Sequence, residues 1–177
     1  ALLCSDSQRF KTVFTEEILK ELSAFGELSV LIDRRNIEEY KSFLTECEVA
    51  FSIFFMPCFT AAEIKAFMPK LKALFYASCS VQSFAVPFLE CGVKVFSAYA
   101  ANAVPVAEYT VAQITLAAKG FYQSSKFYRF SPRRAMRHAN AFTGNFGCKV
   151  GLVGLGAIGS LVAERLKSFD VEVYAYD

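Results

Sequence analysis

Apolar residues in the first half of the chain gather in short runs that alternate with amphipathic segments. Five runs have the length and boundaries typical of buried strands: residues 1–4, 28–32, 48–55, 71–77 and 93–97. Four segments between them have apolar residues at helical spacing: residues 15–25, 37–47, 60–68 and 86–91. This alternation predicts a parallel sheet with helices on both faces, joined by right-handed crossovers.

Two of the predicted helices carry recognisable end signals. Thr15 suits an N-cap, and Gly26 suits the stop that follows a helix. Thr60 with Glu63 three positions later has the capping-box pattern, in which each residue satisfies a backbone N–H of the other.

The second half of the chain has a different pattern. Residues 104–122 are mostly apolar and predict one long helix, and residues 127–146 read as an irregular basic connector. The final stretch, residues 149–177, contains an apolar run, a glycine-rich turn, a helix-like run and a second apolar run ending on an acid. No internal repeat or low-complexity segment is visible.

The glycine-rich turn reads Gly154-Leu155-Gly156-Ala157-Ile158-Gly159, a G-x-G-x-x-G motif between a strand and a helix. In this motif the first glycine permits the tight turn, the second lets the backbone approach a pyrophosphate, and the third allows close helix–strand packing. The N–H groups at the helix start, including those of Ala157 and Ile158, are free to bind phosphate.

Asp177 completes the motif. It lies 18 residues after Gly159, near the separation of about 20 expected for the acid that binds the adenosine ribose. A carboxylate there accepts hydrogen bonds from ribose hydroxyls and repels a 2′-phosphate, so the sequence predicts NAD rather than NADP. The alternative is a glycine-rich strand–helix turn that binds nothing.

Composition and charge argue against several classes of binding partner for this protein. The chain is 54% hydrophobic with a net charge of +2, which gives no general case for nucleic acid or an anionic membrane. No apolar run reaches the roughly 18 residues of a membrane span.

The six cysteines form no C-x-x-C pair, which argues against a zinc site. Thiols scattered along the chain suggest a cytoplasmic protein. The cations and aromatics of the connector fit a packed helix face better than a nucleic-acid patch.

Three stretches together resemble the D-isomer-specific 2-hydroxyacid dehydrogenases: residues 71–81, 92–110 and 147–177. The resemblance implies an α/β fold in which a flavodoxin-like substrate domain, residues 1–98, precedes a Rossmann NAD-binding domain. Residues 99–177 would supply only the first βαβ part of that second domain. A Rossmann sheet normally has six strands, so we expect the chain to be a fragment of a longer protein.

The resemblance also implies a substrate-binding loop at Ser78, Cys79 and Ser80, whose backbone N–H groups would hold a carboxylate. The family usually has glycines in this loop, so its sequence here leaves the substrate open, and an ordinary strand–helix turn is the alternative. Asn102 matches a family Asn that either contacts substrate or braces the hinge. Thr110 is expected near the nicotinamide end of the cofactor.

The residues that perform the family's acid–base chemistry, an Arg, a Glu and a His, lie after the ribose-binding acid. No residue of this chain can be given those roles, and we expect residues 1–177 alone to be inactive. His138 precedes the glycine motif and is expected to be a surface or packing residue.

The leading functional hypothesis is therefore an NAD-dependent dehydrogenase acting on a small 2-hydroxy or 2-keto acid. The resemblance further implies a homodimer, with the apolar helix of residues 104–122 suited to the interface. One alternative is an NAD(H)-sensing or corepressor-like protein of the same fold without catalysis. Another is a different two-domain NAD enzyme, such as an alanine dehydrogenase relative, although the V-A-E-Y-T sequence at 106–110 argues against it.

Overall fold

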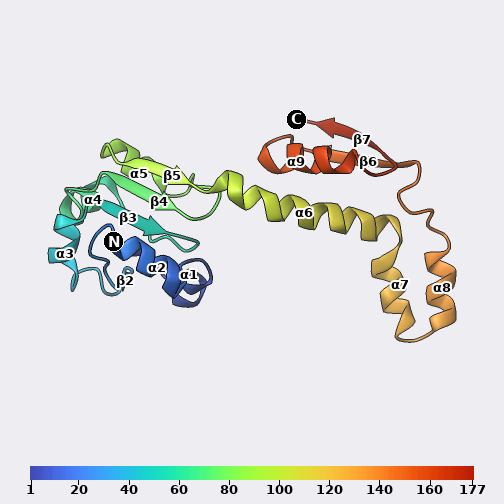
Figure 1. The fold of residues 1–177 in the computed structure, drawn as a ribbon, viewed down its shortest axis with the longest axis horizontal. Helices are drawn as coiled ribbons and strands as arrows, with labels where there is room; N and C mark the ends of the chain where they lie inside the picture. The colour runs from blue at the N-terminus through green and yellow to red at the C-terminus, as the bar shows by residue number, and fades with distance from the viewer. The chain divides into compact units, whose positions relative to one another are not determined.

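A computed structural model describes residues 1–177, which divide into two compact units, Ala1–Tyr99 and Ala100–Asp177. Figure 1 shows the elements of both units along the chain.

The first unit is built on a parallel five-stranded sheet in the order β2-β1-β3-β4-β5 (Figure 1). Its strands are β1 (Leu2–Leu3), β2 (Leu31–Ile32), β3 (Val49–Ser52), β4 (Ala73–Tyr76) and β5 (Lys94–Ser97). Its helices are α1 (Ser7–Val13), α2 (Glu16–Ser23), α3 (Lys41–Glu46), α4 (Ala61–Phe67) and α5 (Ala85–Glu90). The predicted alternation of strands and helices is confirmed, and the sheet is parallel as expected.

Two apolar clusters, one on each face, hold this sheet between its helices. Alternating strand residues such as Ala50 and Leu74 pack with Leu44 of α3, Ile64 of α4 and Phe88 of α5. The second cluster joins Leu2, Ile53 and the partly buried Phe51 with Phe10 and Phe14, which lie in and just after α1. Successive side chains of a strand point to opposite faces of the sheet, and apolar residues occur on both faces here. Helices must therefore pack against both faces to bury them.

The strand register brings the carboxyl ends of the strands to one edge. Ser52 of β3 pairs with Leu3 of β1 on one side and with Tyr76 of β4 on the other, and Tyr76 pairs with Ser97 of β5. The loops that follow these strands are therefore neighbours. In open parallel sheets this edge is where ligands bind.

The same register stacks three phenylalanine rings across the sheet. Phe51 of β3 lies beside Phe75 of β4, with ring centroids 5.6 Å apart, and Phe75 lies beside Phe96 of β5 at 4.9 Å. We call these three rings the phenylalanine ladder. Phe75 and Phe96 are the exposed end of the ladder, since helix α1 and its flanks cover only Phe51.

The second unit contains three helices followed by a βαβ segment. These are α6 (Tyr99–Ala118), α7 (Phe121–Tyr128), α8 (Pro132–Ala139), β6 (Cys148–Val153), α9 (Ala157–Leu166) and β7 (Val171–Tyr176). Strands β6 and β7 are parallel neighbours. Ala107 and Val111 of α6 pack on Val162 and Leu166 of α9, which forms the core of this unit.

The single long helix predicted over residues 104–122 is wrong at both ends. Helix α6 begins five residues earlier, at Tyr99, and contains Pro105. It ends before Gly120, whose φ of +62° favours glycine. A Cβ at this position would also collide with the ring of Phe142, so both the backbone and the packing require glycine here.

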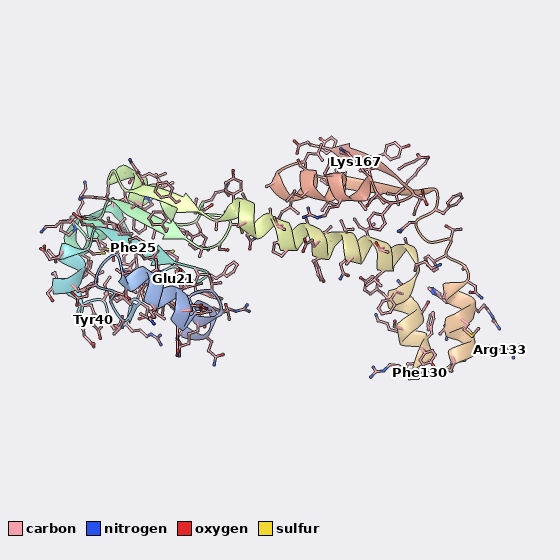
Figure 2. All side chains as sticks on the ribbon, in the orientation of Figure 1. Glu21, Phe25, Tyr40, Phe130, Arg133 and Lys167 are labelled. Carbon is pink, nitrogen blue, oxygen red and sulfur yellow. The ribbon has the colours of Figure 1, made fainter.

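The irregular connector predicted over residues 127–146 is also wrong, because much of it is helical. Helices α7 and α8 lie side by side as a hairpin (Figure 1), with Phe130 and Arg133 at its tip (Figure 2). Ser131 caps α8 by accepting the N–H of Arg134, and Pro132 occupies the first helical position. The guanidinium of Arg134 lies 4.2 Å from the ring centroid of Phe127, which ties the two helices together.

Candidate functional site

The βαβ segment of the second unit forms a glycine-rich turn with an acid beside it. Strand β6 ends at Val153, the turn occupies residues 154–156, and α9 begins at Ala157. Because Val153 pairs with Tyr176, the residue after β7 lies next to the turn. That residue is Asp177, so sheet register alone places the acid beside the glycines.

Glycine is found at each of the three motif positions for a different structural reason. Gly154 has a φ of +94°, a conformation that L side chains rarely adopt. A Cβ on Gly159 would lie 2.0 Å from the carbonyl oxygen of Gly154, so only glycine lets the helix approach the strand this closely. A Cβ on Gly156 would meet no atom within 4 Å. The space beside Gly156 is therefore open to a ligand.

Asp177 is tied to the turn by a hydrogen bond. The backbone N–H of Leu155 donates to Oδ1 of Asp177 over 2.8 Å, and the N–H of Gly154 donates to the carbonyl of Tyr176 over 2.7 Å. The carboxylate is exposed and keeps its second oxygen for a ligand. This bond was not predicted from the sequence, although the βαβ pattern already implied the strand pairing that brings Asp177 to the turn.

The start of α9 is suited to an anion. Its N-cap is Gly156, which has no side chain to accept a hydrogen bond, so the N–H groups of Ala157, Ile158 and Gly159 lack a side-chain cap. The first turn is exposed apart from the half-buried Gly159, and it contains no acidic residue. Free N–H groups and the positive end of the helix dipole together favour a phosphate here.

The predicted substrate loop lies in the first unit, directly after β4. Ser78 is almost fully buried, whereas Cys79 and Ser80 are exposed. Burial raises the pKa of the neighbouring Tyr76 phenol, and the Ser78 hydroxyl partly offsets this rise. The Ser78 side chain thus faces the protein interior, and the exposed part of the loop is formed by Cys79 and Ser80.

Asn102 and Thr110 both lie on α6, at half-buried positions. The hydroxyl of Thr110 donates to the carbonyl of Val106 one turn earlier, over 2.8 Å, and so is held against its own helix. Asn102 lies within the first turn of α6 rather than before it, because the helix starts at Tyr99.

His138 serves as a packing residue of the α7–α8 hairpin. Its Nδ1 lies 3.0 Å from the hydroxyl of Ser124 on α7. The centroid of its ring lies 5.1 Å from the ring centroids of both Phe127 and Phe142.

No group of three or more His, Cys, Asp or Glu side chains is close enough to hold a metal ion. None of the helices combines the length and apolar character that crossing a membrane requires.

Comparison with known proteins points to one family. Residues 111–177 match the family described as D-isomer specific 2-hydroxyacid dehydrogenase, NAD binding domain. D-3-phosphoglycerate dehydrogenase of Mycobacterium leprae (strain TN) is 34% identical over 119 residues, which make up 66% of this chain and 22% of that protein.

Solved structures of similar fold extend over nearly the whole chain. NAD-dependent formate dehydrogenase from Staphylococcus aureus, in complex with NAD, has a TM-score of 0.66 and 23% identity. D-lactate dehydrogenase from Aquifex aeolicus, complexed with NAD and lactic acid, has a TM-score of 0.65 and 23% identity. Each match covers 99% of this chain, and 55% and 50% of those two chains respectively. At these identities the structures show a shared fold.

This chain spans less than a quarter of the M. leprae relative and about half of the two solved structures. Its glycine turn, the acid bonded to that turn and the family match all fall in the same stretch of sequence. Residues 111–177 match the NAD-binding domain of the D-isomer-specific 2-hydroxyacid dehydrogenase family, and the stretch shared with the M. leprae relative makes up 66% of this chain.

Proposed function

We propose that the protein is an NAD-dependent oxidoreductase that transfers a hydride between nicotinamide and C2 of a 2-hydroxy or 2-keto acid. The observation that carries this proposal is the turn of residues 154–159 with Asp177 bonded to it, 2.8 Å from the N–H of Leu155. The match of residues 111–177 to the NAD-binding domain of the 2-hydroxyacid dehydrogenases supports the same reaction class.

The cofactor's pyrophosphate would lie on the free N–H groups of Gly156, Ala157 and Ile158, beside the open space at Gly156. The free oxygen of Asp177 would accept a hydrogen bond from the adenosine ribose. Its negative charge would repel a 2′-phosphate, which is why we propose NAD rather than NADP.

The substrate carboxylate would be held at the carboxyl end of β4. The backbone N–H groups of Cys79 and Ser80 are the proposed donors, because both residues are exposed whereas the Ser78 side chain is buried. Asn102 would either contact the substrate or brace the start of α6. When bound, NADH supplies the hydride that reduces C2 of the keto acid, while the carbonyl oxygen takes up a proton.

The test is a direct assay of the full-length protein. NADH binding is measured by fluorescence titration, and oxidation of NADH is then followed at 340 nm with a panel of 2-keto acids. We expect binding in the micromolar range or tighter and turnover with at least one keto acid, with NADPH bound more weakly. Failure to bind either nucleotide would overturn the proposal.

An NAD(H)-sensing or corepressor-like role is the second candidate. It is favoured by the buried Ser78 side chain, since a loop that turns its hydroxyl inward offers fewer donors to a carboxylate. Tight NADH binding without oxidation by any keto acid would make this the better description.

We also propose a homodimer that uses the second unit. An apolar groove of about 830 Å³ lies between α6 and α9, and its lining includes Val111, Leu116 and Phe169. Light scattering of the full-length protein tests this, and a monomer at micromolar concentration would refute it.

A further inference from the structure

Three consecutive peptide groups lead from β6 into α9, and one hydrogen bond holds each of them. The N–H of Gly154 donates to the carbonyl of Tyr176 over 2.7 Å. The N–H of Leu155 donates to Oδ1 of Asp177 over 2.8 Å. The third bond comes from the helix itself, because the hydroxyl of Ser160 donates to the carbonyl of Leu155 over 2.6 Å. Ser160 lies outside the glycine motif, and the proposed function gives it no role.

The third bond fixes the direction of the Gly156 N–H. The carbonyl of Leu155 and the N–H of Gly156 belong to one peptide group, which is planar and trans, so they point in opposite directions. While the Ser160 hydroxyl holds the carbonyl, the N–H must face the other way. No group of the protein accepts a hydrogen bond from this N–H. Ser160 therefore sets the direction of a donor that is free to bind a ligand.

Little else would hold this peptide group in place. Gly156 has no Cβ, and glycine accepts a wide range of backbone angles, so rotation of the peptide before it meets little steric resistance. Gly154, with a φ of +94°, gives the same freedom on the other side of Leu155. A carbonyl oxygen turned toward a bound phosphate would repel it. The bond from Ser160 excludes that arrangement.

The hydroxyl of Ser160 is not needed for the fold. The side chain is exposed, and its one hydrogen bond is to the turn. The backbone N–H of Ser160 donates to the carbonyl of Gly156 over 3.0 Å, as that of any residue at this helical position would. Alanine also favours a helix more than serine does. Loss of the hydroxyl should thus change the turn without weakening α9.

We propose that Ser160 is a positioning residue of the cofactor site, whose hydroxyl holds the Leu155 carbonyl so that the Gly156 N–H is aimed at the pyrophosphate of NAD. This inference rests on the proposed function, because it assumes that the pyrophosphate lies on residues 156–158. A donor that is already oriented in the free protein strengthens binding, since no free energy is spent on ordering it when the ligand arrives.

The test uses two variants of the full-length protein and fluorescence titration with NADH. Ser160→Ala should weaken NADH binding by about three- to tenfold, the effect commonly produced by losing one neutral hydrogen bond. Its thermal unfolding midpoint should stay within about 2 °C of the parent value. Ser160→Thr keeps a hydroxyl and should bind NADH within about twofold of the parent protein.

The matched control is Ser168→Ala, at the other end of the same helix. Ser168 follows α9, is exposed, and donates its hydroxyl to the carbonyl of Arg165 over 2.9 Å. This substitution removes the same kind of bond at a distance from the turn. It should leave NADH affinity within about twofold of the parent value.

A second measurement assigns the effect to the pyrophosphate. ADP-ribose contains the pyrophosphate and adenosine does not, and both can be titrated in competition with NADH. Ser160→Ala should weaken ADP-ribose by the same factor as NADH and leave adenosine within about twofold. A variant whose whole site was loosened would instead bind all three ligands more weakly.

The outcomes separate this inference from the function on which it rests. A parent protein that does not bind NADH would overturn the proposed function, and the inference with it. Normal NADH binding by the parent and by Ser160→Ala alike would overturn only the role of Ser160. So would a Ser160→Thr variant as weak as Ser160→Ala, or a loss of adenosine affinity as large as that of NADH.

Discussion

At the residue scale, two glycines of the same motif are needed for different reasons, one for packing within the protein and the other for space beside a ligand. Gly159 is required by the protein itself, since a Cβ there would lie 2.0 Å from the Gly154 carbonyl oxygen. Gly156 has open space around it, so its small size matters only when a ligand is present.

Alanine substitutions at the two glycines should therefore differ. Gly159→Ala should lower the free energy of unfolding by about 1–3 kcal/mol, as overpacking does, and abolish NADH binding. Gly156→Ala should leave stability nearly unchanged and weaken NADH binding by at least about tenfold, because the methyl would enter the space proposed for the pyrophosphate. Thermal unfolding and NADH titration measure both effects.

The control for this pair is Gly151→Ala, a position in β6 where a Cβ meets nothing within 4 Å. It should leave both stability and NADH affinity close to the parent values. Equal destabilisation by all three substitutions would show that the distinction between the glycines is wrong.

At the same scale, the proposed function gives Asp177 the choice between NADH and NADPH. Asp177→Asn keeps an acceptor for the Leu155 N–H but removes the negative charge. We expect NADH affinity to fall and NADPH affinity to rise, so that their ratio shifts by about tenfold or more toward NADPH. Titrations with both nucleotides decide this, and an unchanged ratio would remove Asp177 from the ribose site.

At the element scale, the capping box of α4 was predicted from two residues and is present in full. The Thr60 hydroxyl accepts the N–H of Glu63, and the Glu63 carboxylate accepts the N–H of Thr60. The Arg34 guanidinium and these Thr60 bonds together lower the pKa of Glu63 to about 2. The carboxylate thus joins the helix start to the loop after β2.

This lowered pKa predicts a pH-dependent stability contribution. Because the folded-state pKa lies below the usual 4.5, the contribution is fully present above pH 4.5 and is lost as the pH falls toward 2. Glu63→Gln should cost about 0.5–1 kcal/mol at pH 7 and progressively less as the pH approaches 2.

Denaturant titrations at several pH values measure this difference. The matched control is Glu46→Gln, which removes an exposed ion pair with Lys70 and no helix cap. A Glu63→Gln deficit that stays constant down to pH 2 would contradict the assignment.

The elements that were predicted correctly are those marked by several signals within a short stretch of sequence. The turn at 154–159 and the α4 cap depend on neighbours within a few residues. The hairpin of α7 and α8 was missed although Ser131-Pro132 is a strong helix start, because basic composition was read as a connector. The positive φ of Phe55 has no local cue, since bonds from Ser5 and Cys4, about fifty residues away, impose it.

At the scale of the whole molecule, each unit has its own apolar core. The first unit has helices against both faces of its sheet, so it contains what a cooperative fold needs. We expect residues 1–99 alone to unfold in one cooperative transition, measured by circular dichroism against denaturant. A gradual, non-cooperative loss of signal would show that the unit depends on the rest of the protein.

The position of β5 has a consequence for colloidal behaviour. As the outermost strand it leaves one row of backbone N–H and C=O groups unpaired, and the phenylalanine ladder ends on it at Phe96. Such a border can recruit a strand from another molecule and seed aggregates. The strand is only four residues long and begins with the exposed Lys94, whose charge discourages that growth. We therefore expect Lys94 to limit aggregation during folding and at high protein concentration.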